Sequence, residues 1–159
     1  MGDHHGWQKQ NFFEASCRIP FLLSWPEQLP GRVHRRELIS LADLFGIATS
    51  AGGALETREG IDLLGVLQGA SPPRPHLVGM TEPPGSQFFK IMVVKDEWKY
   101  VFMANGGCEQ LFNLHKDPNE LANRVSANSA VRDDLAQIAA AACRVPGAEE
   151  ALQDDRLRF

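Results

Sequence analysis

The side chains best suited to acid–base and anion chemistry gather in a short polar segment at the start of the chain. The first ten residues, MGDHHGWQKQ, contain Asp3, His4, His5 and Lys9. The ammonium of Lys9 is a fixed cation, and the imidazole of His4 or His5 can donate a proton near neutral pH. A lysine and a histidine facing one oxyanion would suit hydrolysis of a sulfate or phosphate ester, since the cation offsets charge and the imidazole protonates the departing alcohol. The spacing alone equally fits a solvated surface loop or incidental metal capture by the two histidines.

The elements that follow must hold this segment in place, and the first is predicted to be a strand. Residues 19–25, IPFLLSW, form a short continuous apolar run that Pro26 ends. A run of this length predicts a buried strand with neighbours on both sides. Without those neighbours it would expose an apolar edge, so the isolated chain is expected to associate or aggregate.

A helix and a second apolar stretch are predicted next. Residues 39–48 carry apolar side chains at helical spacing, namely Leu41, Leu44, Phe45 and Ala48. Ser40 with Asp43 three residues later indicates a capping arrangement, and Gly52 ends this helix. The second apolar stretch covers residues 61–67 and closes at Gly69.

The second half of the chain changes to a strand pattern. Residues 70–86 hold five of the ten prolines and are predicted to be a connection. Residues 88–94 and 98–103 are rich in β-formers and predict a hairpin, which a third strand over 109–114 follows. Two helices complete the pattern, one starting at Asp117-Pro118-Asn119-Glu120 and one over 130–143.

The composition is that of an ordinary globular protein. The 159 residues are 43% hydrophobic and 23% charged, with 16 basic and 20 acidic side chains, a net charge of −4 and a pI near 5.7. A mildly acidic surface argues against nucleic acid or an anionic membrane as the main partner. No apolar run approaches the roughly 18 residues that span a bilayer, and the polar start does not resemble a signal peptide.

The three cysteines, Cys17, Cys108 and Cys143, form neither a CxxC pair nor a zinc-ligand pattern. They are predicted to be buried or half-buried free thiols in a reducing compartment. One disulfide with one free thiol is the alternative if the protein is exported.

Four stretches, in order over about residues 1–126, resemble the sulfatase family. The first is GDHHGWQKQNFFEASCRIPFLLSWP, which is similar to the family's Gly-Asp/Glu-His, Trp, Lys, aromatic-Glu-x-Ser and Arg-x-Pro pattern. ELISLADLFGIATSAGG and EGIDLLGVLQG look like the next two segments. KIMVVKDEWKYVF with EQLFNLHKDPNELANRV is similar to the C-terminal strands and the signature that follows them.

The resemblance implies an α/β fold, the C-terminal part of an alkaline phosphatase-like α/β/α sandwich with a small antiparallel sheet and a C-terminal helix. Residues 1–80 would end the catalytic domain, with the active-site lysine loop, a core strand and helices. Residues 81–159 would form the subdomain of antiparallel sheet and helix.

By the same resemblance, Lys9 is expected to contact the sulfate group. His4 would either border the pocket or hydrogen-bond within its loop, and Trp7 would be a pocket wall or a packing residue. Lys9 and His4 are thus the catalytic candidates, and Lys9, Trp7 and His4 the substrate-binding ones. Glu14 and Arg18 are expected to form a structural pair, and Asp43 to brace its helix.

The resemblance also shows which family motifs this sequence lacks. The nucleophile of the family is a formylglycine made in a Cys/Ser-x-Pro-x-Arg motif, and Cys17-Arg18-Ile19-Pro20 and Cys143-Arg144-Val145-Pro146 place proline one position too late. The metal-binding aspartates would precede Met1, so this chain is expected to hold no metal ligand. The complete enzyme would bind a divalent cation, calcium by family expectation, through residues outside the chain.

The function implied is therefore that of a C-terminal fragment or subunit of a sulfatase, inactive alone. It would need the missing N-terminal catalytic portion as partner and would act on a sulfate ester of a small molecule or a glycan. An oligomer is possible, and the compartment stays open between cytoplasm and periplasm. One alternative is a phosphonate or phosphate monoester hydrolase of the same superfamily, and another is a non-catalytic partner or pseudoenzyme remnant.

Overall fold

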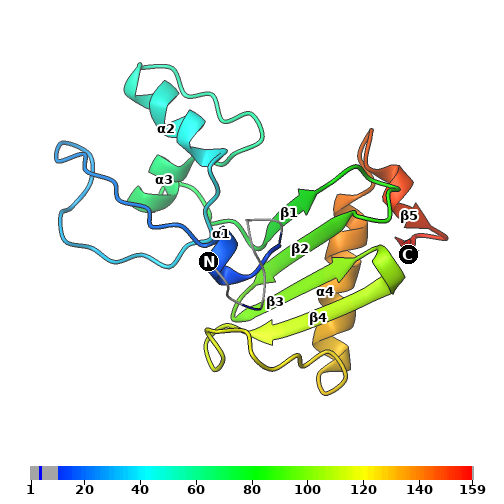
Figure 1. Cartoon of the computed structure of the whole chain (residues 1–159). Coiled ribbons are helices and arrows are strands. Elements are labelled where there is room, and N and C mark those ends of the chain that lie inside the picture. The colour runs from blue at the N-terminus through cyan, green and yellow to red at the C-terminus, as the bar shows by residue number, and fades with distance from the viewer. Residues whose placement is uncertain (1–3, 5–10, 159) are drawn as a thin grey trace. The chain divides into compact units, whose positions relative to one another are not determined.

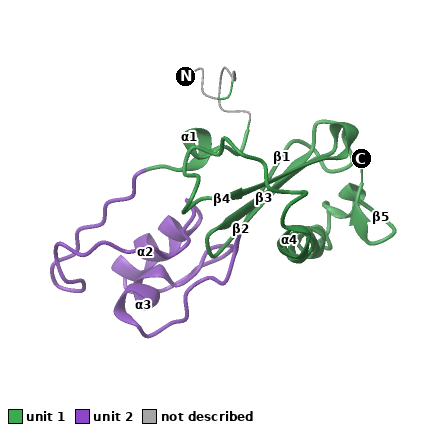
Figure 2. Ribbon diagram, turned by 90° about the horizontal axis from the view of Figure 1, so that it is seen from below, with its two compact units in different colours: residues 1–19, 78–159 green, residues 20–77 purple. Residues whose placement is uncertain are grey.

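The computed structural model describes residue 4 and residues 11–158, which form two compact units. One unit joins residues 1–19 to residues 78–159, and the other contains residues 20–77 (Figure 2). The helices described are α1 (Glu14–Cys17), α2 (Asp43–Ala51), α3 (Leu63–Gln68) and α4 (Ser129–Ala142), with 3₁₀ helices η2 (Asn105–Gly107) and η3 (Glu149–Ala151). The strands are β1 (Leu77–Thr81), β2 (Lys90–Lys95), β3 (Trp98–Met103), β4 (Cys108–Asn113), β5 (Leu152–Gln153) and β6 (Arg156–Leu157).

A four-stranded sheet in the order β1-β2-β3-β4 dominates the larger unit (Figure 1). β2 and β3 pair antiparallel with Lys95 opposite Trp98, so Asp96 and Glu97 alone form the turn. Asp96 has a φ of +52°, a left-handed conformation that aspartate tolerates better than most residues. The predicted hairpin is confirmed, and so is the third strand, since β4 pairs antiparallel with β3.

β1 corrects the prediction that residues 70–86 are only a connection. The strand occupies Leu77–Thr81, between the two groups of prolines. It lies at the edge of the sheet, beside β2. An edge position needs only one row of backbone hydrogen bonds, so a short proline-free run is enough to form it.

One face of the sheet packs on α4 and makes the core of this unit. Because side chains alternate along a strand, Ile91, Tyr100 and Leu111 share a face, and each is at most 1% exposed. They join Leu135 and Ala139 of α4 in one apolar cluster. Figure 1 shows α4 running across the strands on this side. The predicted C-terminal helix is thus confirmed.

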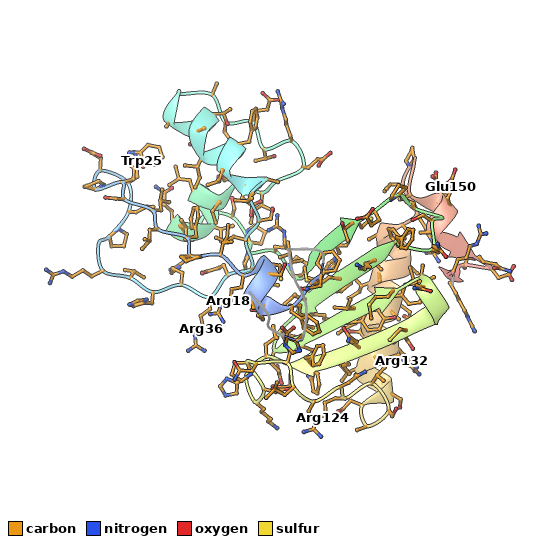
Figure 3. The ribbon with its side chains drawn as sticks, in the orientation of Figure 1. Arg18, Trp25, Arg36, Arg124, Arg132 and Glu150 are labelled. Atoms are coloured by element: carbon orange, nitrogen blue, oxygen red, sulfur yellow. The ribbon has the colours of Figure 1, made fainter. Side chains whose placement is uncertain are left out.

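A polar contact ties α4 to the edge of the core. The Tyr100 hydroxyl donates to Glu109 Oε1 at 2.6 Å, and Arg132 of α4, labelled in Figure 3, lies 3.3 Å from Glu109 Oε2. Burial raises the pKa of the Tyr100 phenol, and the Glu109 carboxylate raises it further. The phenol therefore stays a neutral donor, and the carboxylate links strand to helix.

The unit of residues 20–77 contains α2 and α3. Asp62 caps α3 by accepting from the Gly65 N–H at 3.0 Å, and Gly69 ends it in the left-handed conformation, with φ +79°. α2 begins at Asp43, and Gly52 caps its end as predicted. Leu41 and Leu44 of the expected apolar face are 64% and 41% exposed, so that part of the prediction is wrong.

Backbone packing explains which side of α2 is buried. A Cβ on Gly46 would lie 3.1 Å from the carbonyl oxygen of Ile61. This close approach turns the side that carries Gly46 and Asp43 inward, and these are the buried residues of the helix. The side of α2 that faces inward is therefore the one where glycine allows a close backbone approach, and not the one that the apolar spacing of the sequence indicates.

The strand predicted over residues 19–25 is a second correction. Residues 18–25 belong to no helix or strand, and Figure 3 shows the backbone from Arg18 to Trp25 as an irregular coil. Ile19 is 48% exposed and Leu22 is 95% exposed. A strand buried on both faces needs strands beside it, and none of the six described strands pairs with this stretch.

No described helix is long and apolar enough to cross a membrane.

Candidate functional site

Among the residues predicted to handle a sulfate ester, His4 is described, whereas Lys9 and Trp7 lie outside the described residues. The exposed His4 ring stacks on Phe13, with centroids 3.7 Å apart and planes 3° from parallel. Its Nε2 lies 3.0 Å from the carbonyl oxygen of Asn119. A carbonyl only accepts, so Nε2 carries the proton in this contact. His4 is therefore bonded to a turn far along the chain.

Aromatic side chains dock the segment after Lys9 on the sheet. The Phe13 ring lies 6.0 Å from that of Phe112 on β4, tilted by 54°, a geometry typical of aromatic pairs. Phe12 lies against Gly79, where an added Cβ would come within 3.2 Å of both Phe12 Cε1 and Met92 Cε. Figure 2 shows α1 and α4 on opposite sides of the strands. Phe12, Phe13 and α1 thus pack on the face of the sheet opposite α4.

The predicted pair of Glu14 and Arg18 forms only a loose contact. Arg18 Nη1 lies 3.9 Å from Glu14 Oε2, and the arginine side chain, labelled in Figure 3, is 76% exposed. Exposed pairs of this kind contribute little, about 0–1 kcal/mol. Glu14 has a closer and far more buried partner in Lys99.

Lys99, Glu14 and Glu120 form a buried charge cluster, which we call the Lys99 cluster. Lys99 Nζ lies 2.8 Å from Glu14 Oε1 and 2.9 Å from Glu120 Oε1. Glu120 Oε2 also accepts from the backbone N–H of Glu14. The side chains of Lys99 and Glu120 are 0% and 2% exposed. One ammonium therefore joins α1, the inner strand β3 and the turn that carries Glu120.

The Lys99 cluster keeps its cation charged. Burial alone would lower the pKa of the Lys99 ammonium, but the hydrogen bond to Glu14 and the other groups around it raise that pKa above its ordinary value. Cys17 is among those groups, with Sγ 3.6 Å from Lys99 Nζ. All three cysteines are free as predicted, although Cys17 and Cys108 are exposed and only Cys143 is buried.

The turn that carries Glu120 replaces the helix predicted to start at Asp117. Glu120 has a φ of +54°, which a right-handed helix cannot contain. The Asp117 carboxylate accepts from the N–H groups of Leu121 and Ala122 at 3.1 and 2.9 Å, and these bonds lower its pKa. The residues that suit a helix start therefore cap a tight turn, which aims Glu120 at Lys99.

Asp43 braces its helix, as predicted, in the unit of residues 20–77. Its fully buried carboxylate accepts from Arg74 Nη2 at 2.8 Å and Nη1 at 2.9 Å, and from the N–H groups of Ser40 and Ile61 at 2.8 and 3.0 Å. Burial works to raise the pKa of Asp43, but these four donors lower it overall. The Asp43 site is therefore structural: its four hydrogen bonds join the start of α2 to Arg74 and to the backbone of Ile61.

Sequence reasoning missed Lys99 as a site residue. The feature that could have indicated it is a lysine within the apolar strand WKYVFM. It was missed because a lysine in a strand is ordinarily expected to face solvent. Glu120 was noticed only as part of a helix start. Among residue 4 and residues 11–158, no group of three or more histidine, cysteine, aspartate or glutamate side chains could hold a metal ion.

Comparison with known proteins identifies relatives of this chain. No family model matches the chain. Choline-sulfatase of Rhizobium meliloti (strain 1021) is 32% identical over 128 residues, which cover 77% of this chain and 24% of the relative. Arylsulfatase K of Xenopus laevis is 30% identical over 134 residues, which cover 76% of this chain and 25% of the relative. The chain thus spans about a quarter of the length of the curated relatives it matches.

The fold agrees with these relatives. A structure from Bacteroides fragilis, the protein yidJ named as a sulfatase, superposes with a TM-score of 0.70 at 23% identity, over 88% of this chain and 33% of that one. The mixed α/β fold, with its small sheet and C-terminal helix, is that of part of a sulfatase. The chain belongs to the sulfatase family, and the partial coverage agrees with the C-terminal portion that the motifs indicate.

Proposed function

We propose that this chain is part of an enzyme that hydrolyses sulfate esters and that it contributes the lysine that binds the sulfate group. The observation that carries the proposal is the similarity to choline-sulfatase over 77% of the chain. The name of that relative points to a small organic sulfate. The substrate class proposed here is therefore a sulfate ester of a small alcohol or a glycan.

Lys9, His4 and Trp7 are given separate roles in this proposal. The Lys9 ammonium would neutralise the non-bridging sulfuryl oxygens, which gain charge as the ester bond breaks. The imidazole of His4 would supply a proton to the departing alcohol, and Trp7 would form a wall beside the ester. The stacking on Phe13 holds the plane of the His4 ring, and because Nε2 donates to the Asn119 carbonyl, the proton for the alcohol would have to come from Nδ1 of the imidazolium form.

The nucleophile and the divalent cation are proposed to come from outside this chain. None of its cysteines lies in a Cys/Ser-x-Pro-x-Arg motif. The cation, calcium by analogy with the family, would supply a Lewis acid for the sulfate and the nucleophile. We therefore expect the purified chain to be inactive by itself.

Co-expression tests this function. The DNA upstream of the Met1 codon is searched for a Cys/Ser-x-Pro-x-Arg motif, and its product is co-purified with this chain. The complex is assayed with a sulfate and a phosphate ester of one aryl alcohol, and we expect the sulfate to be preferred. Lys9→Ala is expected to lower kcat/KM by roughly 10²–10³-fold, the size of losing one transition-state contact.

Lys116→Ala is the matched control, because Lys116 is an exposed lysine on a turn of the same unit. Its kcat/KM is expected to stay within about twofold of the unchanged complex, as for most surface substitutions. Equal losses in both variants, or preference for the phosphate ester, would refute the proposed sulfatase role. Turnover by the chain alone that Lys9→Ala abolishes would refute the need for a nucleophile from outside.

A further inference from the structure

A groove of about 350 Å³ lies between the β2–β3 turn and the first part of α4, and we call it the Trp98 groove. The last cross-strand pair of the hairpin, Lys95 and Trp98, lines one side of it. Ala130, Val131 and Leu135 of α4 line the other side. Sites for small ligands have volumes of about 300–1,000 Å³. The groove therefore has room for a small organic molecule and a lining that is partly aromatic and apolar.

Carboxylates outnumber cations in the lining of the Trp98 groove. Asp134 of α4 pairs with Lys95 at 2.7 Å, so these two charges offset each other. The turn residues Asp96 and Glu97 are exposed, and their side chains have no ion-pair partner in the part of the chain that the structure describes. One lysine against three carboxylates leaves the described lining with a net charge of −2. Such a surface attracts cations and repels anions, including a sulfate ester.

Trp98 is the lining residue best suited to contact a cation. Its side chain lies on the same face of β3 as that of Tyr100, where it is half-buried against the apolar core. The face of an indole ring attracts cations more strongly than the rings of phenylalanine or tyrosine do. The ammonium of Lys95, the neighbour of Trp98 across the hairpin, is bound by Asp134 instead. A cation from solution can therefore occupy the place beside the ring.

The distribution of the lining residues indicates which kind of cation fits. Leu135, at 1% exposure, and the half-buried Trp98 form the inner part, whereas Asp96 and Glu97 belong to the exposed turn. A primary ammonium needs hydrogen-bond acceptors around each N–H, and an apolar inner lining does not provide them. A quaternary ammonium has no N–H group, and its methyl groups carry the charge against an apolar or aromatic wall.

We propose that the Trp98 groove binds a small quaternary ammonium cation. The methyl groups would contact Trp98 and Val131, and the carboxylates of Asp96 and Glu97 would balance the charge. The inference does not depend on the proposed function, because its test measures binding without turnover. Failure of either one therefore leaves the other standing.

The test titrates the ¹⁵N-labelled 159-residue chain with choline chloride at constant ionic strength, followed by NMR. The indole signal of Trp98 is the one that Trp98→Leu removes. We expect this signal and the amide signals of Asp96, Glu97 and Val131 to move and to saturate. The uncharged 3,3-dimethylbutan-1-ol, which has carbon in place of the choline nitrogen, is expected to bind about 2- to 30-fold more weakly, the range that cation–π contacts provide.

Two variants test the two parts of the site. Trp98→Leu removes the ring, and choline binding, followed at the Val131 amide, is expected to weaken by the same 2- to 30-fold. The double variant Asp96→Asn/Glu97→Gln removes both unpaired charges and is expected to weaken binding about fivefold or more. Asparagine tolerates the left-handed backbone of Asp96, with φ +52°, so the turn is kept. If Trp98→Leu fails to fold, the double variant decides, because both of its side chains are exposed.

Glu150→Gln is the matched control. Glu150, labelled in Figure 3, is an exposed glutamate of the same unit that does not line the groove. This variant is expected to bind choline within about twofold of the unchanged chain. The absence of saturating shifts with choline would overturn the proposal. Equally tight binding of the uncharged alcohol, or unweakened binding in the double variant, would overturn it as well.

Discussion

Arg74→Met is expected to destabilise the unit of residues 20–77 more than any surface substitution in it. The arginine supplies two of the four donors to the fully buried Asp43 carboxylate, at 2.8 and 2.9 Å. Without it the charge would be left with two backbone N–H groups, and breaking a buried pair in this way costs about 3–5 kcal/mol. Leu63 and Val66 are the buried hydrophobic side chains of this unit, and each contributes about 1.5–3 kcal/mol. The ion pair is therefore as important here as the apolar core.

Amide hydrogen exchange measures this effect where it occurs. The amides of Ser40 and Ile61 donate to Asp43, so their exchange reports opening of the anchor. A loss of 3–5 kcal/mol corresponds to roughly 10²-fold to more than 10³-fold faster exchange. Urea denaturation of the same variant measures its free energy of unfolding in parallel.

Arg58→Met serves as the control for the same unit. Arg58 pairs with Glu56 at 3.1 Å, but the two side chains are 65% and 59% exposed, and the guanidinium lies over the Phe45 ring. Its loss is expected to cost about 1 kcal/mol or less. A cost below about 1 kcal/mol for Arg74→Met as well would refute the reasoning, because the carboxylate would then not depend on its buried cation.

Two further predictions concern pH and the core. Because the pKa of Asp43 lies below its ordinary value of 3.8, its stabilisation is fully present above about pH 4 and is lost as pH falls through the folded value. At pH values below about 4, the urea concentration at the midpoint of unfolding should decrease as the pH falls. Asp43→Asn should make this decrease smaller, and an equal decrease in that variant would contradict the prediction. Leu111→Ala, at 0% exposure, is expected to cost about 2–5 kcal/mol, and Leu121→Ala, at 78%, within about 0.5 kcal/mol by thermal denaturation. Equal costs would contradict the assigned core.

Local patterns predicted the sheet of the larger unit because its strands pair with neighbours in sequence. β2 and β3 are joined by two residues, and β4 follows after a short turn, so each strand finds its partner close by. The helix over 129–142 was equally predictable, since its apolar side has a complete sheet face to cover. The strand pairs depend on contacts over short distances along the chain, whereas α4 packs on strands far from it in sequence and was predictable from its own residue types.

The predictions that failed depend on distant partners or on backbone geometry. Residues 19–25 are apolar enough for a strand, but no described strand lies beside them. Asp117 has the residue type of a helix start, and the left-handed backbone of Glu120 makes it the cap of a turn. Lys99 looked like a surface residue, because nothing near it in sequence shows that two glutamates would bury it.

Ribosomal synthesis makes the residues of the larger unit in an order that delays its assembly. Glu14 emerges early, but its partners Lys99 and Glu120 follow 85 and 106 residues later. At about 5–20 residues per second, the N-terminal segment waits roughly 5–20 s before the turn that binds it exists. The whole of residues 20–77 is made within that interval and can fold first. The segment that carries Glu14 is therefore among the last parts of the larger unit to reach its final place, although it is made before its partners.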